Sequence, residues 1–251
     1  MTRPDIVVLG RRAEHRGLLR QFYDSIYVPA FPDPDEREPL ANMQHAEDRH
    51  AAGFDEGNTY RILLAIKAGV VLGGSICDYL VDPNCGIIGF LAVAAAARGS
   101  GIGAALHAAT CAALEQDSRA SGRDGLSATL IELEDPRRTP QQDLAFDPVA
   151  RAMFWNRLGY MALRFHYVQS ALSPSQKPVL GLLLAARPAD PALQYAFPSE
   201  AVLRLLRAYI IWAMRIERPE SDPDFAAMAA CLSAQASVLL MPLSEYCPNR
   251  T

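Results

Sequence analysis

The chain has 251 residues, about 50% of them hydrophobic, so it is long enough to bury a large core. Its net charge of -4 and its pI near 5.7 argue against a general nucleic-acid binder, which would carry a basic face. Five scattered cysteines predict neither a disulfide framework nor a metal site. There is no apolar leader and no run of ~18 apolar residues, so we expect a soluble, cytoplasmic protein without a membrane span.

The first part of the chain predicts a strand, two helices and three strands. Residues 5–9 form a short apolar run, and the apolar spacing over residues 15–27 predicts a helix. A proline-rich loop then gathers four acidic side chains before a second helix: Asp33, Asp35, Glu36 and Glu38. Runs at 59–66 and 70–80 flank Lys67-Ala-Gly69 and predict a hairpin, and residues 85–95 predict a further buried strand.

A glycine-rich turn joins that strand to the next helix. It reads Arg98-Gly99-Ser100-Gly101-Ile102-Gly103, followed by Ala104. Glycines let backbone N–H groups approach one point, and the first helical turn leaves its N–H donors unpaired, so the segment is suited to hold a pyrophosphate. Arg98 would add a charge-assisted contact. The alternative is a tight connection with no ligand.

The second part predicts a strand, a helix and two strands. Residues 127–134 alternate as a strand that places Glu132 and Glu134 on one face. Asp147 is the predicted N-cap of a helix over residues 149–158 that stops at Gly159. Strands are expected at 164–172 and 178–186.

Two motifs resemble the GNAT superfamily of acyl-coenzyme A N-acyltransferases. The spacing Arg-x-x-Gly-x-Gly after a strand is similar to the acyl-coenzyme A loop of that family, and Phe154-Trp155-Asn-Arg-Leu-Gly-Tyr160 is similar to its later helix end. The order of elements agrees from about residue 5 to residue 187. The resemblance implies an α/β fold, with a mixed, mostly antiparallel central sheet flanked by helices.

The C-terminal part lies outside the family pattern. We predict a GNAT acyltransferase domain over residues 1–188 and a C-terminal helical extension over 189–251. This extension would be a hairpin of helices at 198–215 and 221–240. Its apolar face would complete the core, cover the acceptor cleft or form a homodimer.

The resemblance implies acetyl-CoA, or another acyl-CoA, as co-substrate. Backbone groups of Leu91 and Val93 would hold the pantetheine arm and the thioester, and the amides from Gly99 to Ala104 would hold the pyrophosphate. Ala95 stands where many relatives carry proline. In the family the loop between the first two helices helps to form the acceptor pocket, whereas from the residues alone a solvated acidic loop is an equal alternative.

An acceptor amine must lose a proton before it attacks, which relatives achieve with a carboxylate. The glutamate that some relatives carry on the central strand is replaced here by Ile87. We therefore expect Glu134, with Glu132 second, to act as base or to bind the amine; the alternative is a pair of carboxylates in salt bridges. Trp155 stands where relatives place a tyrosine acid, and its indole cannot supply a proton, so we expect it to line the acyl or pantetheine channel.

Three functions remain open. The first is transfer of an acyl group, foremost acetyl, to a primary amine of a small molecule or peptide. The second is transfer of a long acyl chain from coenzyme A or an acyl carrier protein. The third is non-catalytic binding of acyl-CoA. No metal is implied.

Overall fold

The computed structural model describes residues 3–10, 13–51, 57–139, 147–172 and 175–248. By its contacts the chain divides into two compact units. Unit 1 comprises Met1–Pro32, Arg37–Val81 and Gly86–Leu126, and unit 2 comprises Asp33–Glu36, Asp82–Cys85 and Ser127–Thr251. The domain boundary at residue 188 stays a prediction.

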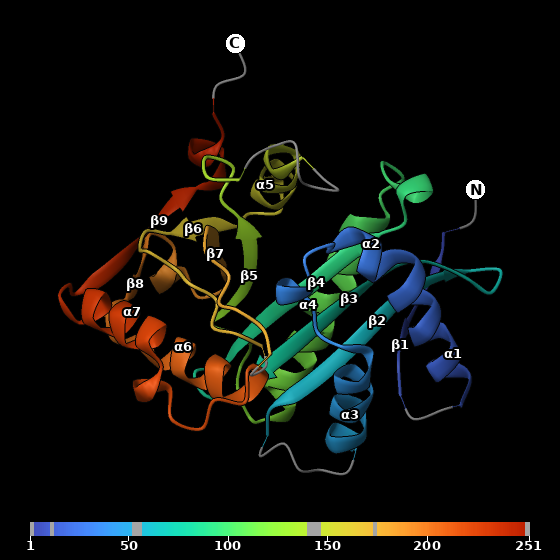
Figure 1. Cartoon of the computed structure of the whole chain (residues 1–251), viewed down its shortest axis with the longest axis horizontal. Helices are drawn as coiled ribbons and strands as arrows, with labels where there is room; N and C mark the ends of the chain where they lie inside the picture. The colour runs from blue at the N-terminus through green and yellow to red at the C-terminus, as the bar shows by residue number, and fades with distance from the viewer. Residues whose placement is uncertain (1–2, 11–12, 52–56, 140–146, 173–174, 249–251) are drawn as a thin grey trace. The chain divides into compact units, whose positions relative to one another are not determined.

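Unit 1 is a layer of strands with helices against it (Figure 1). Its strands, in their order across the sheet, are β1 (Asp5–Val8), β2 (Thr59–Lys67), β3 (Val70–Leu80) and β4 (Cys85–Val93, of which Cys85 belongs to unit 2). Its helices are α1 (Ala13–Phe22), α2 (Val28–Ala30), α3 (Leu40–Ala51) and α4 (Ile102–Ala120), with a π-helical turn at Tyr23–Tyr27. The predicted first helix is therefore confirmed but is not regular along its length.

Two neighbouring glycines of β3 show how helices cover both faces of this sheet. A Cβ atom at Gly73 would lie 3.0 Å from the Leu106 side chain of α4, and one at Gly74 would lie 2.7 Å from the Phe22 ring of α1. Successive strand residues point to opposite faces, so α4 and α1 pack on opposite sides of β3. The glycines allow both helices to approach the strand closely.

The predicted hairpin is confirmed as β2 and β3. Its turn residues Ala68 and Gly69 have φ angles of 50° and 77°. Positive φ at both central positions is the geometry that matches the twist of a two-residue hairpin.

Unit 2 contains the second run of strands, which lie in the order β5, β7, β6, β9, β8. Their bounds are β5 (Ala128–Glu134), β6 (Met161–Leu163), β7 (Leu182–Pro188), β8 (Ala196–Pro198) and β9 (Ser237–Pro242), and each pairs antiparallel with its neighbour. The helices are α5 (Pro148–Arg157), α6 (Ser199–Ala213) and α7 (Pro223–Ser233). Short 3-10 helices lie at Pro34–Glu36, Pro191–Leu193, Pro219–Ser221 and Leu243–Tyr246 in this unit and at Ala95–Ala97 in unit 1. The predicted mostly antiparallel α/β fold is confirmed.

The helix that follows β5 was predicted with its caps. The Asp147 carboxylate accepts hydrogen bonds from the Val149 and Ala150 N–H groups at 2.9 and 3.4 Å. Gly159 has a φ of 88° and ends the helix. Both signals are local, which is why the sequence reveals them.

The predicted strand at 164–172 is wrong. The strand of this region is β6, which ends at Leu163, and the following segment makes only an isolated bridge between Gln169 and Val179. The Phe165 N–H turns back to the Leu163 carbonyl at 2.9 Å, which ends the extended ladder. The next strand begins at Leu182 and not at residue 178, because Gly181 before it has a φ of 88°.

The second C-terminal helix was predicted too long. It ends at Ser233, and Ser237–Pro242 forms β9 instead. The reason lies in the burial pattern, since Val238 is 1% exposed and Leu239 is 49% exposed, which is the alternation of a strand. The C-terminal segment therefore adds β8 and β9 to a sheet as well as contributing α6 and α7.

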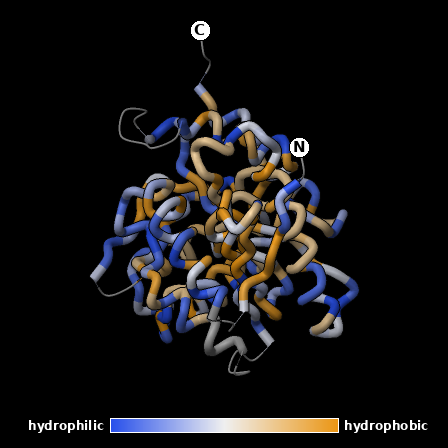
Figure 2. Tube along the Cα trace, turned by 90° about the vertical axis from the view of Figure 1, so that its right-hand side faces the viewer, coloured by the Kyte–Doolittle hydropathy of each residue, from blue (hydrophilic) through white to orange (hydrophobic). Residues whose placement is uncertain are grey.

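Hydrophobic and hydrophilic stretches alternate along the chain (Figure 2). In the described ranges no helix is both long and apolar enough to cross a bilayer. The same ranges hold no group of three His, Cys, Asp or Glu side chains arranged for a metal ion.

Candidate active site

The turn before α4 in unit 1 has the geometry of an open backbone loop. Gly99 and Gly101 have φ angles of 73° and 85°, and a Cβ atom at either position would meet nothing within 4 Å. Ile102 is 6% exposed and anchors the start of the helix in the core. The turn is therefore fixed at its base and exposed at its tip.

The N–H groups of this turn are not used within the described chain. Residues 99–104 donate no backbone hydrogen bond there, and the first such bond of the region runs from the Ala105 N–H to the Gly101 carbonyl at 3.0 Å. The Ser100 hydroxyl donates to the Ala97 carbonyl at 2.5 Å, and the Arg98 Nε donates to the Val93 carbonyl at 3.4 Å. Six consecutive donors thus remain at the positive end of a 19-residue helix.

The other donor-site candidates lie on β4 and α5. Leu91 and Val93 are half-buried on β4, where their backbone groups are candidates to hold the donor. Ile87 on the same strand is 1% exposed, so β4 has a buried apolar side chain where some relatives carry a glutamate. Trp155 in unit 2 is 6% exposed and packs edge-on against Phe154 and Tyr160, with ring centroids 5.2 and 5.1 Å apart. That is a packed position, and a contact of Trp155 with a donor stays a prediction.

Unit 2 buries the Glu132 carboxylate in a network of three donors. The Tyr167 hydroxyl donates to Oε1, and the Tyr209 hydroxyl and the Gln169 amide donate to Oε2 at 2.9 and 3.2 Å. Burial raises the pKa of Glu132, and these hydrogen bonds lower it in part. A carboxylate held this way on both oxygens is poorly placed to accept a further proton from a substrate.

Glu134, two residues further along β5, has one oxygen in an ion pair and one oxygen that has no hydrogen-bond donor among the described residues. Its Oε1 forms an ion pair with Arg151 of α5. Its Oε2 is buried and accepts no hydrogen bond from any described residue. A buried acceptor without a donor is costly, so this atom is suited to a donor group from a bound molecule.

Glu36 joins the two glutamates of β5 from a distant part of the sequence. Its loop residues Asp33–Glu36 belong to unit 2, where the Gln176 amide donates to the Pro34 carbonyl at 2.7 Å. Burial, followed by the nearby charge of Glu134, raises the pKa of Glu36 to about 7. A carboxylate that titrates near neutral pH is the kind of group that general-base chemistry requires.

Sequence patterns alone did not single out Glu36. The residue is one of four acids in one loop. That loop contacts a segment at Lys177 that is 142 residues away in sequence, so the burial of Glu36 could not be predicted from neighbouring residues. The usable signal was the clustering of acids between prolines.

Comparison with known proteins supports the class that this fold indicates. Residues 19–123 match the model of the acetyltransferase (GNAT) family. A GNAT-family protein from Bacteroides thetaiotaomicron has a similar structure, with a TM-score of 0.56 at 16% identity, covering 83% of this chain and 98% of its own. No curated protein matches the sequence at a significant level.

Two further solved structures are less similar. The ribosomal-protein-S18-alanine N-acetyltransferase from Escherichia coli has a TM-score of 0.47 at 14% identity, covering 75% of this chain and 99% of its own. A GNAT acetyltransferase from Staphylococcus aureus has a TM-score of 0.48 at 16% identity, covering 74% of this chain and 100% of its own. The fold is assigned from its similarity to the structure from Bacteroides.

The fold and the family match together define an acyltransferase, which confirms the class that the sequence motifs predicted. The residues that match the family model, 19–123, include the turn before α4. Domains of this class transfer acyl groups from acyl-coenzyme A.

Proposed function

We propose that this protein is an N-acyltransferase that moves an acetyl group from acetyl-CoA to a primary amine of a small molecule or peptide. The observation that carries the proposal is the turn before α4, with six consecutive N–H groups that have no backbone partner in the described chain. Converging amides at a helix start are suited to a diphosphate. Arg98 at the mouth of the turn supplies the positive charge.

The donor would lie along β4 in this proposal. Backbone groups of Leu91 and Val93 would hold the pantetheine amides and the thioester oxygen, where an N–H stabilises the charge that develops on acyl transfer. The amides of Gly99 to Ala104 would hold the pyrophosphate. Trp155 remains the candidate for a wall of the acyl channel.

The acidic residues of unit 2 would receive the amine. Glu36 is the candidate base, because its raised pKa lets it take a proton from an ammonium ion near neutral pH. Glu134 would bind the amine through its open Oε2 and would keep the pKa of Glu36 high. Glu132 is then a structural carboxylate that fixes Tyr167 and Tyr209.

Amine-dependent release of thiol tests the proposal. The protein is first titrated with coenzyme A and with acetyl-CoA by calorimetry, and then acetyl-CoA turnover is measured with a panel of mono-, di- and polyamines and peptides. We expect binding of both nucleotides and thiol release that depends on at least one amine. Binding without turnover on any amine would favour a non-catalytic acyl-CoA module, and faster release from a long-chain donor would favour long-chain transfer.

A further inference from the structure

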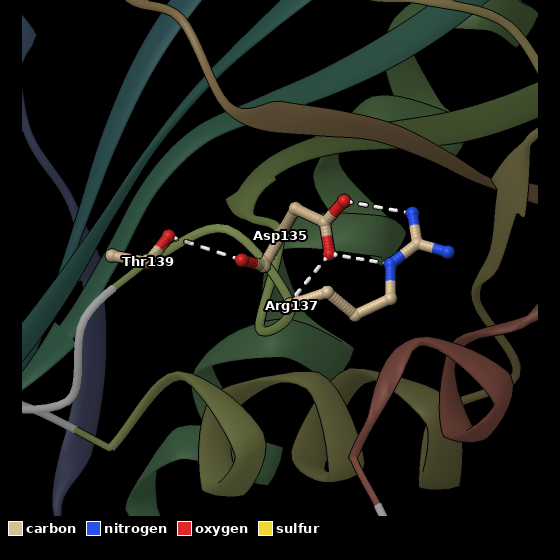
Figure 3. Close-up of polar contacts among 3 residues, drawn as sticks. All are labelled: Asp135, Arg137 and Thr139. Atoms are coloured by element: carbon tan, nitrogen blue, oxygen red, sulfur yellow. Dashed lines mark hydrogen bonds and ion pairs between the residues drawn. The ribbon is translucent and has the colours of Figure 1, made fainter.

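A turn directly after β5 places a set of arginines together in unit 2. The Asp135 carboxylate accepts a hydrogen bond from the Arg137 backbone N–H at 3.0 Å and binds the Arg137 guanidinium through Nε and Nη2 at 3.0 and 2.8 Å. The Asp135 carbonyl accepts from the Thr139 hydroxyl at 3.0 Å (Figure 3). Asp135 is 2% exposed, so it is a rigid, buried anchor.

This turn borders a cavity of about 380 Å³. The cavity is lined by Arg137, Arg138, Arg164 and His166, with Phe165 and Leu182 as apolar walls. Its volume is within the range of small-molecule sites. We call it the arginine pocket.

The charge of the arginine pocket is opposite to that of the whole chain. Three arginines face a single acidic lining residue, Asp135, which already holds Arg137. Among the described residues, the exposed side chains of Arg138 and Arg164 form no ion pair. In a protein with a net charge of -4, such a local excess of guanidinium groups indicates an anionic ligand.

Tyr246 shows that the arginines converge. The Arg137 guanidinium lies 4.1 Å from the centre of the Tyr246 ring. Burial raises the pKa of Tyr246, while the charges of Arg137 and Arg164 act against that rise. Arg164, which follows β6, is therefore close to the same ring as Arg137, which follows β5.

We propose that the arginine pocket binds a small organic anion, a carboxylate or phosphate attached to a flat apolar group, through the guanidinium groups of Arg138 and Arg164. Guanidinium is suited to both anions because it donates two parallel hydrogen bonds. Phe165 and Leu182 would contact the apolar group. The site goes beyond the proposed acyl transfer and needs neither coenzyme A nor an amine.

Binding of phenyl phosphate and of benzoate to the whole protein tests this site, with benzyl alcohol as the neutral analogue. We expect saturable calorimetric binding of at least one anion, and the stronger of the two identifies the preferred head group. The variants Arg138→Ala and Arg164→Ala should each weaken that binding about 10-fold, because each removes one charged contact. Arg204→Ala is the control, since Arg204 is an exposed arginine of α6 in the same unit, 3.5 Å from Asp82, and it should bind like the parent chain.

Three results would overturn the proposal. One is no saturable binding of either anion, and another is equal binding of benzyl alcohol. The third is anion binding that survives in the Arg138→Ala, Arg164→Ala double variant but is lost in Gly101→Trp, which would place the anion at the turn before α4. Thermal melting of each variant confirms folding, and the exposed positions of both arginines make a folding defect unexpected.

Discussion

The turn before α4 and the carboxylates of unit 2 are two different kinds of candidate site. The turn is made of backbone, with Gly99 and Gly101 open to space and N–H groups as its chemistry. The carboxylates are side chains brought together from distant segments, Glu36 from an N-terminal loop and Glu134 from β5. The first kind depends on local geometry and the second on packing.

This difference has consequences for substitution. A backbone site is damaged by filling its space or changing its φ angles, and it tolerates exchange of most side chains. A carboxylate cluster is damaged by removing a single charge, because each charge alters the pKa of its neighbours. The expected effects of substitution follow this contrast, from the largest to the smallest.

Gly101→Trp should abolish coenzyme A binding, with a loss of about 100-fold or more in affinity, equivalent to about 2.7 kcal/mol. The indole would occupy the space in front of the amides, and calorimetric titration measures the loss. Gly122→Trp is a matched control. Gly122 lies just beyond the other end of α4, has a φ of 82° against 85° at Gly101, and would likewise place a Cβ atom with nothing within 4 Å of it.

The two tryptophan variants carry the same backbone strain, so they separate binding from stability. If the two variants melt at the same temperature and only Gly101→Trp loses binding, coenzyme A binds at the turn before α4. Unchanged affinity in a folded Gly101→Trp protein would remove the pyrophosphate assignment.

The geometry of the turn before α4 and of the β2–β3 turn was predictable from the sequence because the signals for each are local. Glycines at positive φ, the start of α4 and the β2–β3 turn all follow from neighbouring residues, and the structure has them at Gly101, Ile102 and Gly69. Sequence reasoning failed where pairing is long-range. The segment at 164–172 alternates like a strand, yet Tyr167 and Gln169 turn to Glu132, a partner about 35 residues away.

The same reasoning limited the candidate acids. Strand alternation placed Glu132 and Glu134 on one face, but it could not distinguish the carboxylate with three donors from the one with an open oxygen. Glu36 was hidden for a further reason, since its pKa is raised by burial and then by the charge of Glu134, which is about 100 residues away in sequence.

Glu134→Gln should reduce turnover by roughly 100-fold while leaving coenzyme A affinity unchanged, since a carboxylate that handles the amine acts on the acceptor and not on the donor. Steady-state kinetics and calorimetry on the same protein measure the two quantities. Glu115→Gln, at a half-buried helix carboxylate of unit 1 that pairs with Arg119, serves as the control and should keep full turnover. A fall in donor affinity alone would leave Glu134 without a catalytic part.

Glu36→Gln should remove the pH dependence of turnover near neutrality. A base must be deprotonated, so turnover of the parent chain should rise with pH through about 7, and this rise should disappear in the variant. In Glu134→Gln the rise should move to lower pH, because one of the charges that raises the pKa of Glu36 is gone. A rise that persists unchanged in Glu36→Gln would assign the base to another residue.

Stability gives an independent measure of the same carboxylate. The folded pKa of about 7 lies above the ordinary value of 4.5, so the folded protein binds the Glu36 proton more tightly than the unfolded chain does. The free energy of unfolding should therefore fall as pH rises from 4.5 to 7 and level off above it. Glu36→Gln should be more stable relative to the parent at about pH 8 than at about pH 4, as urea titrations at both values would measure.

The smallest effects on binding and turnover concern Glu132, which we regard as structural, so its substitution should change stability instead. Glu132→Ala would leave the donors of Tyr167, Tyr209 and Gln169 without their acceptor and should lower the free energy of unfolding by about 3 kcal/mol. Tyr209→Phe removes one of these donors and should cost about 1 kcal/mol. Tyr195→Phe, at a tyrosine that is 77% exposed, should change nothing measurable.

Urea unfolding of the three variants also distinguishes a structural role for Glu132 from a catalytic one. If the carboxylate only fixes the two tyrosines, Tyr209→Phe should lose stability and keep its turnover at a temperature where it is fully folded. A Tyr209→Phe protein that is as stable as the parent but turns over much more slowly would instead place Glu132 beside Glu134 in the chemistry, and the contrast between the two carboxylates would fail.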